Sequence, residues 1–508
     1  MIITMKNTET REISAKIDEL HEERGEAALG RVLTLLISTN EASLEHDLEV
    51  ANSASREHPC RVIAIAPNSR KMDADTDDGQ PHTFLDAEVR FGSDAGAGEI
   101  IVLRPLGGLV YHADTLVIPL LVPDAPVVYD YNKMELDFTA TSDLVGGSTL
   151  ENMHNYFSSK TASQQNEYTG MFEGYNVIQL VLEGFSGYAI DPELTPTLYK
   201  LANEGFVFNN YYTALHFTST SNGECQTLLG LYPKNGSPIT MKRTGELGTN
   251  AYFSLAQQLG KQGYQVVGYH DNQDMYGRNA SHTNLGYDWK YYTNGLQCEE
   301  NAAGTDRLWP QRDKYMMEVS VDDYINSDVP FHVYYLTVSG HTNYGWNRVA
   351  NQYKDLVSGL PYSEKTQAYV AAAAIEVDRA LEYLLQRLEE AGKLDNTLIV
   401  ATGDHIPYAD VDVLEELTGK TFGTSEALTN IDERNIDFDV YKNTLIMWSA
   451  SMEKPVEVDK VCCQVDILPT VSNLLGLEYD SRLMSGHDVF AQNYNASQAS
   501  TCMPLVIL

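Results

Sequence analysis

The chain has 508 residues, which is enough for two or three domains with separate hydrophobic cores. A hydrophobic fraction of 43% with 10% aromatic residues is typical of a globular protein. The net charge of −36 at pH 7 argues against nucleic acid as a partner and against adsorption to anionic lipid, because both require surfaces rich in Lys and Arg.

The six cysteines are scattered and form no CxxC pair, so neither a zinc site nor a disulfide scaffold is predicted. The N-terminus lacks the charged and then apolar profile of a signal peptide. No uninterrupted apolar stretch approaches the roughly 18 residues of a membrane span. We therefore expect no export signal and no transmembrane helix in this sequence.

The first part of the chain alternates helical and extended patterns, which predicts a small α/β domain over residues 1–129. It shows no constellation of catalytic residues. Residues 130–172 are rich in Ser, Thr and Asn, and we interpret them as a linker or an arm packed on the next domain, with a short helix near 150–156. The elements predicted in the first domain are helices at 13–24 and 41–58 and strands at 32–37, 61–66, 86–91 and 99–104.

The strand and helix alternation is sustained over residues 173–508, which predicts a mostly parallel central sheet flanked by helices. Thr195 and Pro196 supply an N-cap and a first-turn proline for one helix. Ser363 begins a long helix that runs through an alanine-rich segment to Gly392.

Four apolar runs of this domain lead directly to side chains that bind metal or phosphate. Because the carboxyl ends of parallel strands meet at one edge of an open sheet, these side chains are expected to form an active site. A lone His after a strand is more often structural, but several such features in one domain are hard to assign to packing. The runs are 176–182 before Glu183, 264–269 before His270, 331–338 before His341, and 397–402 before Asp404 and His405.

The residue types predict metal-assisted chemistry on a phosphate. Glu183, Asp404 and His405 form a mixed carboxylate and imidazole set that suits Mn²⁺, Mg²⁺ or Zn²⁺. The hydroxyl-rich segment 217–224 would supply a nucleophile whose pKa the metal lowers. His341 is placed to protonate a leaving oxygen, while His270 and Arg278 are suited to hold phosphate oxygens.

Residues of about 145–508 resemble the catalytic domain of lipoteichoic acid synthases, within the alkaline phosphatase/sulfatase superfamily. The motifs that carry the resemblance run in the family's order along the chain. They are Leu182-Glu-Gly-Phe-Ser186, Ser219-Thr-Ser-Asn-Gly-Glu224, His270 to Arg278 followed by Leu285-Gly-Tyr-Asp288, Val338-Ser-Gly-His341, Gly403-Asp-His405 and Asp466 to Gly476.

The resemblance implies one divalent metal ion, Mn²⁺ ahead of Mg²⁺ or Zn²⁺, and a threonine nucleophile, Thr220. It further implies that His270, Arg278 and His341 contact the phosphoglycerol group. Tyr276 falls near the usual position of a tryptophan, with the spacing one residue shorter. The implied metal ligands are Glu183, Thr220, Asp404 and His405.

The function implied is transfer of glycerol phosphate from phosphatidylglycerol to a polyglycerolphosphate chain through a covalent Thr220 intermediate. A sulfatase activity would need Cys or Ser in a Cys-x-Pro-x-Arg context, and Cys225 is followed by Gln-Thr-Leu-Leu. A phosphoethanolamine transferase, or another phosphodiesterase of the superfamily, is the alternative.

Residues 1–129 resemble a different family, the glucose-6-phosphate dehydrogenase assembly protein OpcA. The matching segments include Arg31-Val-Leu-Thr-Leu-Leu36 and Ala51 to Ile63. This resemblance implies a dehydrogenase partner, and the second alternative is a non-catalytic protein that binds it. The change of family near 128–130 suggests a join of two gene fragments. We also expect that the C-terminal end, an apolar run at 503–508, is truncated relative to the synthases.

The two resemblances conflict on localisation. The synthases act at the outer face of the bacterial membrane, whereas no signal or membrane helix is recognised in this sequence.

Overall fold

A computed structural model defines the fold, and its contacts divide into two compact units, Met1–Val128 and Tyr129–Leu508. In the first unit it describes the backbone of five strands. In the second it describes residues 129–138, 148–213, 220–233, 241–247, 251–424 and 437–494.

The first unit contains a five-stranded sheet in the order β1-β2-β3-β5-β4, with all neighbours parallel except β4 and β5. The four predicted strands are found within two residues of their expected limits, and β1 is an additional strand. The predicted helices at 13–24 and 41–58 lie outside the described residues. The strands are β1 (Ile2–Lys6), β2 (Leu33–Ile37), β3 (Arg61–Ile65), β4 (Phe84–Arg90) and β5 (Ile100–Pro105).

The second unit is built on a nine-stranded sheet in the order β11-β10-β9-β12-β6-β13-β14-β7-β15. Four adjacent strands, β9, β12, β6 and β13, are parallel, and these are the four apolar runs that the sequence analysis identified. They are β9 (Gln265–His270), β12 (Phe331–Leu336), β6 (Asn176–Leu182) and β13 (Thr397–Gly403). Their carboxyl ends therefore meet at one edge, as predicted.

The other strands of the second unit extend this sheet or form a small second sheet. They are β7 (Phe206–Phe208), β10 (Asp288–Tyr292), β11 (Gly295–Leu296), β14 (Leu445–Trp448) and β15 (Val456–Val458) in the main sheet, with β8 (Tyr211–Tyr212) and β16 (Cys462–Cys463) paired separately.

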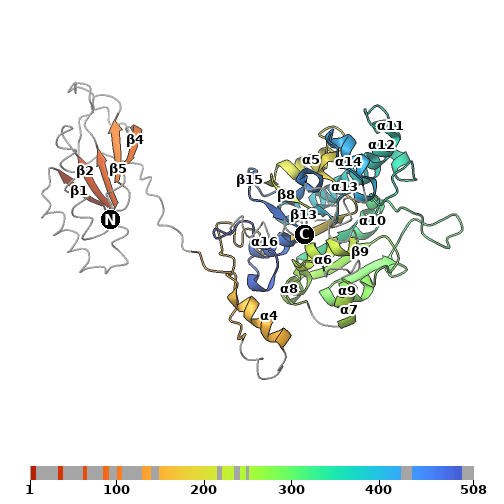
Figure 1. Ribbon diagram of the computed structural model, residues 1–508, viewed down its shortest axis with the longest axis horizontal. Coiled ribbons are helices and arrows are strands. Elements are labelled where there is room, and N and C mark those ends of the chain that lie inside the picture. The colour runs from red at the N-terminus through yellow and green to blue at the C-terminus, as the bar shows by residue number, and fades with distance from the viewer. Residues whose placement is uncertain are drawn as a thin grey trace. The chain divides into compact units, whose positions relative to one another are not determined.

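Helices cover both faces of the main sheet (Figure 1). On one face α5 (Pro196–Asn203), α10 (Asp313–Ser320) and α13 (Glu376–Glu390) pack on alternate residues of β6, β12 and β13. The opposite face is covered by α6 (Thr220–Leu229), α8 (Leu255–Lys261), α9 (Arg278–Leu285) and α16 (Ile467–Leu474). Both faces of the central strands are thus buried, which explains why they appear in the sequence as continuous apolar runs. The expected α/β fold is confirmed.

The remaining helices are shorter or peripheral. They are α4 (Ser148–Ser159), α7 (Lys242–Leu247), α11 (Lys354–Val357), α12 (Glu364–Tyr369) and α14 (Val411–Thr418). The predicted helix at 150–156 is α4. In the described ranges no helix combines the length and the apolar composition of a membrane span.

A π-helical turn, Val370–Ile375, joins α12 to α13 and makes one continuous helix out of the segment that Ser363 begins. The Ser363 hydroxyl accepts a hydrogen bond from the Thr366 amide, so this predicted N-cap is confirmed.

Thr195 is the N-cap residue of α5 and Pro196 is its first residue, as predicted, but the Thr195 side chain makes no capping hydrogen bond. The Thr195 side chain bonds to the backbone of Asp191, and the amide of Leu198 donates instead to the Asp378 carboxylate on α13 at 2.8 Å.

The arm at 129–138 packs on the C-terminal part of the second unit. The amide of Asn132 donates to the Ser163 carbonyl, and the Asn132 side chain donates to Asn473 at 3.0 Å. The Met134 amide donates to the Asp480 carboxylate. These contacts tie the start of the unit to α16 and to the turn at Asp480.

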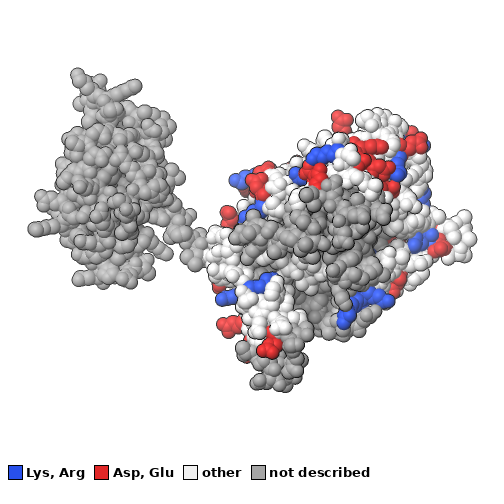
Figure 2. All heavy atoms as spheres, in the orientation of Figure 1, with Lys and Arg blue, Asp and Glu red and all other residues white. Residues whose placement is uncertain are grey.

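The strongly acidic composition is visible on the surface of the second unit. Figure 2 shows Asp and Glu side chains gathered along the upper rim of the described surface, with Lys and Arg side chains between them.

Candidate active site

Three of the predicted ligands converge at the carboxyl edge of the sheet. Glu183 follows β6, and Asp404 and His405 follow β13, which is the parallel neighbour of β6. Their ligand atoms all lie within 4.8 Å of one another. His405 Nε2 is 3.2 Å from Asp404 Oδ2 and 3.5 Å from Glu183 Oε1.

The orientation of His405 points to a cation at this position. Its Nδ1 lies 2.9 Å from the Ile406 carbonyl oxygen, which only accepts hydrogen bonds, so Nδ1 carries the proton. Nε2 then presents a lone pair toward two carboxylates. Three electron-rich groups in a buried place repel one another unless a cation or a proton lies between them. The donor set therefore fits one divalent metal ion.

The Asp404 carboxylate is held by backbone groups. Its Oδ1 accepts hydrogen bonds from the Gly184 amide at 2.8 Å and from the His405 amide at 2.7 Å. Burial, and then the negative charge of Glu183, raise its pKa well above the ordinary value. Oδ2 has no hydrogen-bond partner among the described residues. An oriented carboxylate with one free, buried oxygen is suited to a metal ligand.

Thr220 is the first residue of α6, and its hydroxyl donates to Glu183 Oε2 at 2.9 Å. The structure thus brings the predicted nucleophile to the predicted metal ligands. The amino end of α6 favours negative charge at this point.

Gly223 allows α6 to approach the predicted metal ligands closely. A Cβ atom at Gly223 would overlap the backbone carbonyl of Asp404. The close contact between α6 and the end of β13 therefore requires glycine at this position.

Arg278 is oriented by Glu224, which lies one helical turn after Thr220 on α6. The Glu224 carboxylate accepts from Arg278 Nε at 2.9 Å, pairs with His282 Nε2 at 2.9 Å and accepts from the Tyr334 hydroxyl at 3.0 Å. Burial alone would raise the pKa of Glu224, but Arg278 and His282 lower it to about 2. Among the described residues no group accepts a hydrogen bond from the Arg278 Nη atoms. These donors remain for an anionic ligand.

His270 ends β9 and is buried. Its Nδ1 is 3.0 Å from the Leu336 carbonyl, so the proton is on Nδ1 and the buried Nε2 has no partner in the described part of the chain. Burial, and then the charge of Arg278, lower the pKa of His270 to about 3. The imidazole is therefore neutral and offers a lone pair at Nε2.

His341 follows a tight turn beyond β12. The backbone of Gly340 is pressed against Glu183, and the turn is held by the Asp313 carboxylate, which accepts from the amides of Val338 and Ser339. The His341 Nδ1 lies 2.5 Å from the Thr342 carbonyl, which leaves Nε2 to exchange a proton. His341 thus follows a turn packed on the segment that carries Glu183.

Tyr276 has a backbone φ of +61° and is 38% exposed. The Arg278 guanidinium lies 5.1 Å from the centre of its ring. The structure therefore places Tyr276 beside Arg278, on the outer side of the site.

Several residues next to the site were not recognised in the sequence. Glu224 and His282 lie inside helices, and Asp313 begins α10. One signal was available, because Glu224 is four residues after Thr220 and therefore on the same helix face.

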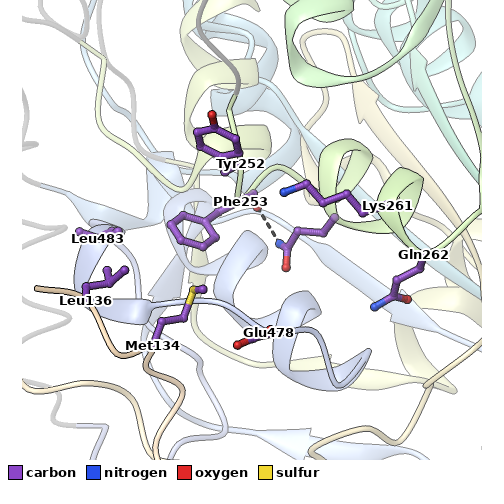
Figure 3. A pocket seen from close by; sticks show the side chains of 9 residues that line it. Met134, Leu136, Tyr252, Phe253, Lys261, Gln262, Glu478 and Leu483 are labelled. Atoms are coloured by element: carbon purple, nitrogen blue, oxygen red, sulfur yellow. Dashed lines mark hydrogen bonds between the residues drawn. The ribbon is translucent and has the colours of Figure 1, made fainter.

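A separate cavity of about 570 Å³ lies away from these side chains. Figure 3 shows Met134 and Leu136 of the arm facing Phe253 and Leu483 across it. None of the predicted site residues lines it.

The fold and the site define a member of the alkaline phosphatase/sulfatase superfamily. Residues 176–477 match the family model described as Sulfatase, and the chain belongs to this family. The comparisons confirm the expectation of an enzyme of the phosphotransferase/sulfatase type. Residues 51–142 match a second model, described as Glucose-6-phosphate dehydrogenase subunit N-terminal domain.

The curated relatives with the most similar sequences include lipoteichoic acid synthases. Lipoteichoic acid synthase 2 of Bacillus subtilis (strain 168) is 26% identical over 361 residues, covering 69% of this chain and 52% of that protein. The lipoteichoic acid synthase of Staphylococcus saprophyticus is 26% identical over 372 residues, covering 69% and 53%. The chain thus spans about half the length of the curated relatives it matches.

A solved structure, that of the lipoteichoic acid synthase LtaP from Listeria monocytogenes, shares the fold. The TM-score is 0.53 at 21% identity, and the match covers 67% of this chain and 81% of that one.

Proposed function

We propose that this chain is a metal-dependent phosphoglycerol transferase of the lipoteichoic acid synthase kind. It would move glycerol phosphate from phosphatidylglycerol to a polyglycerolphosphate chain. The observation that carries the proposal is the Thr220 hydroxyl, which lies 2.9 Å from Glu183 within the cluster of Glu183, Asp404 and His405. The names of the curated relatives support the choice of substrate.

Glu183, Thr220, Asp404 and His405 would hold the metal ion, with Mn²⁺ as the expected one. A divalent ion in this place lowers the pKa of the bound hydroxyl and offsets charge on the phosphoryl oxygens.

The two chemical steps use Thr220 and His341. Thr220 Oγ1 attacks the phosphorus of the diester while its proton passes to Glu183 Oε2, to which the hydroxyl already donates. The bond to the diacylglycerol oxygen breaks, and protonated His341 gives that oxygen a proton. In the second step His341 takes the proton of the acceptor hydroxyl, which attacks the phosphorus and releases Thr220 with its proton returned from Glu183. Two displacements replace one difficult transfer.

Arg278 and His270 would bind different parts of the transferred group. The Arg278 Nη atoms would donate to phosphoryl oxygens, because Glu224 uses only Nε. Neutral His270 offers an acceptor at Nε2, which suits a glycerol hydroxyl rather than a phosphate oxygen.

The Thr220→Ala variant tests the mechanism. It is expected to release no diacylglycerol from a fluorescent phosphatidylglycerol in the presence of Mn²⁺, while its melting temperature stays close to that of the wild type. Thr220→Ser keeps a hydroxyl and is the matched control, with reduced but measurable release. EDTA should stop the wild-type reaction. Undiminished turnover by Thr220→Ala would exclude the covalent route.

Parallel assays with phosphatidylethanolamine test the alternative head group. A phosphoethanolamine transferase would release diacylglycerol faster from that lipid than from phosphatidylglycerol. We expect the opposite order.

A further inference from the structure

A short hairpin beside the site presents two side chains in a fixed geometry. Its two arms are joined by hydrogen bonds from the Leu308 amide to the Glu299 carbonyl at 2.7 Å and from Asn301 to Asp306 at 2.9 Å. A β-bridge pairs Glu300 with Arg307. The hairpin is therefore an ordered element, and it carries Arg307 and leads to Trp309.

The base of the hairpin is anchored to the unit. The Glu299 carboxylate pairs with Arg312 at 2.9 Å and with Arg348 at 2.7 Å. Arg348 also donates to the Pro310 carbonyl at 2.9 Å, and the Gln311 side chain donates to the Glu299 carbonyl. These bonds on both sides of Trp309 restrict its movement relative to the sheet.

Arg307 is a cation without an ion pair in the part of the chain that the structure describes. Arg312 and Arg348 share Glu299, and Arg278 pairs with Glu224, whereas no carboxylate of the described residues lies within 4.0 Å of Arg307. Burial raises the pKa of the nearby Asp271, and the smaller effect of the Arg307 charge acts to lower it. The Arg307 Nε is buried without a hydrogen-bond partner among the described residues. Such a cation is unusual in a chain with a net charge of −36, and it suits an anionic ligand.

Trp309 connects Arg307 to the active site. The Arg307 guanidinium lies 4.7 Å from the Trp309 ring, and the Trp309 ring meets the His341 ring edge-on at 5.2 Å. Trp309 is 43% exposed, so its ring is open to a ligand. An unpaired cation, an open aromatic face and the proposed proton donor thus follow one another along the edge of the site.

We infer that Arg307 and Trp309 form the subsite for the anionic acceptor chain. Arg307 binds the second phosphate counted from the reacting end of the acceptor, and Trp309 packs against the terminal glycerol phosphate unit between that phosphate and the reacting hydroxyl. The terminal hydroxyl then lies at His341. This inference rests on the proposed function and adds to it how the acceptor is recognised.

The proposed subsite predicts that the rate of transfer depends on the length of the acceptor, and that this dependence requires Arg307. A glycerolphosphate acceptor with two or three phosphates reaches Arg307, whereas one with a single phosphate does not. Charge-assisted hydrogen bonds to a phosphate correspond to an affinity change on the order of tenfold. The wild type is expected to prefer the longer acceptors by about that factor.

The test uses the full-length chain and the Arg307→Gln, Trp309→Ala and Trp309→Phe variants. The ratio of transfer to lipid hydrolysis is measured with acceptors of one, two and three phosphates. Arg307→Gln should remove the length preference, Trp309→Ala should lower transfer for all lengths, and Trp309→Phe should keep most of it. Arg387→Gln is the matched control, because Arg387 on α13 pairs with the exposed Asp322 and its replacement changes the net charge equally.

A binding measurement separates this inference from the proposed function. In the Thr220→Ala background, calorimetry measures binding of the three-phosphate acceptor without turnover, and adding Arg307→Gln should weaken it about tenfold. Equal affinity, or an unchanged length preference in Arg307→Gln, would overturn the subsite. If the wild type releases no diacylglycerol but binding still depends on Arg307, the proposed reaction fails and the anion subsite stands.

Discussion

Buried carboxyl groups determine how the free energy of unfolding of this protein changes with pH. Glu376, at the start of α13, is fully buried and bonds to the Lys314 amide at 3.0 Å and the Tyr353 hydroxyl at 2.5 Å. Burial raises its pKa to about 7, helped by the neighbouring Asp313 and opposed by Tyr353. The pKa of Asp313 is itself raised to about 6 by burial.

The sign of this effect follows from the raised pKa. The folded protein binds the Glu376 proton more tightly than the unfolded chain, so the stabilisation is complete below about pH 4.5 and is lost as pH rises through about 7. The loss is on the order of a few kcal/mol, because one pKa unit corresponds to about 1.4 kcal/mol. Thermal unfolding between pH 5 and pH 8 should show a smaller decline for Glu376→Gln than for the wild type. Parallel declines would contradict the assignment.

The clustering of Glu183, Asp404 and His405 was predictable from the sequence, whereas the position of Trp309 beside His341 was not. Glu183, Asp404 and His405 each follow a continuous apolar strand, and parallel strands bring such residues to one edge. Thr220 came from the family motif rather than from any periodicity. Trp309 lies in a loop, and it reaches His341 only through the fold, so its position left no sequence signal.

At the scale of elements, the contact between α6 and the end of β13 sets the distance between the proposed nucleophile, Thr220, and the proposed metal ligands. Gly223→Ala places a methyl group against the Asp404 carbonyl, so α6 must move away. We expect Mn²⁺ affinity and lipid hydrolysis to fall by at least about tenfold, which corresponds to 1.4 kcal/mol. Calorimetric Mn²⁺ titration and the diacylglycerol assay measure the two effects.

Gly260→Ala provides the matched control. Gly260 also lies in a helix, α8, but a Cβ there meets only a Val266 methyl group at an ordinary 3.8 Å. Alanine favours helix over glycine, so this variant should be neutral or slightly more stable. Equal losses in both variants would mean that Gly223 acts through helix stability and not through its contact with Asp404.

The positions of the elements were predicted well, whereas hydrogen bonds to residues distant in the sequence were not predicted. The run 397–403 is buried on both sides, and its pattern alone identified it as a strand. The Thr195-Pro196 signal located the start of α5 correctly, but the Leu198 amide in its first turn donates to Asp378, which is 180 residues away in the sequence. Local patterns cannot reveal an acceptor supplied by another helix.

At the scale of the whole molecule, the chain consists of two compact units, and two different family models match it. The second match, residues 51–142, extends past the division at Val128 and into the arm that packs on the second unit. The dehydrogenase partner expected from the first unit stays a prediction. It can be tested by co-purification with residues 1–128.

The second unit should function without the first. Its sheet, both helix layers and all the proposed ligands lie within residues 129–508. A protein comprising these residues is expected to bind Mn²⁺ and hydrolyse phosphatidylglycerol within about twofold of the full-length chain, a difference below 1 kcal/mol. Loss of metal binding in the shorter protein would show that the first unit contributes to the site.

The π-helical turn at Val370–Ile375 gives the alanine run a role in spacing. The Glu376 amide donates to the Ala371 carbonyl, five residues back, so the turn holds one residue more than a regular α-helical turn. Within it, the Ala372 carbonyl accepts from the Ser339 hydroxyl at the turn before His341. The length of this run therefore determines two things. It determines how α12 is rotated relative to α13, and, through the bond to Ser339, the position of the turn that precedes His341. Inserting or deleting an alanine in this run would therefore shift His341 and alter catalysis, whereas replacing one alanine with another residue would not shift it.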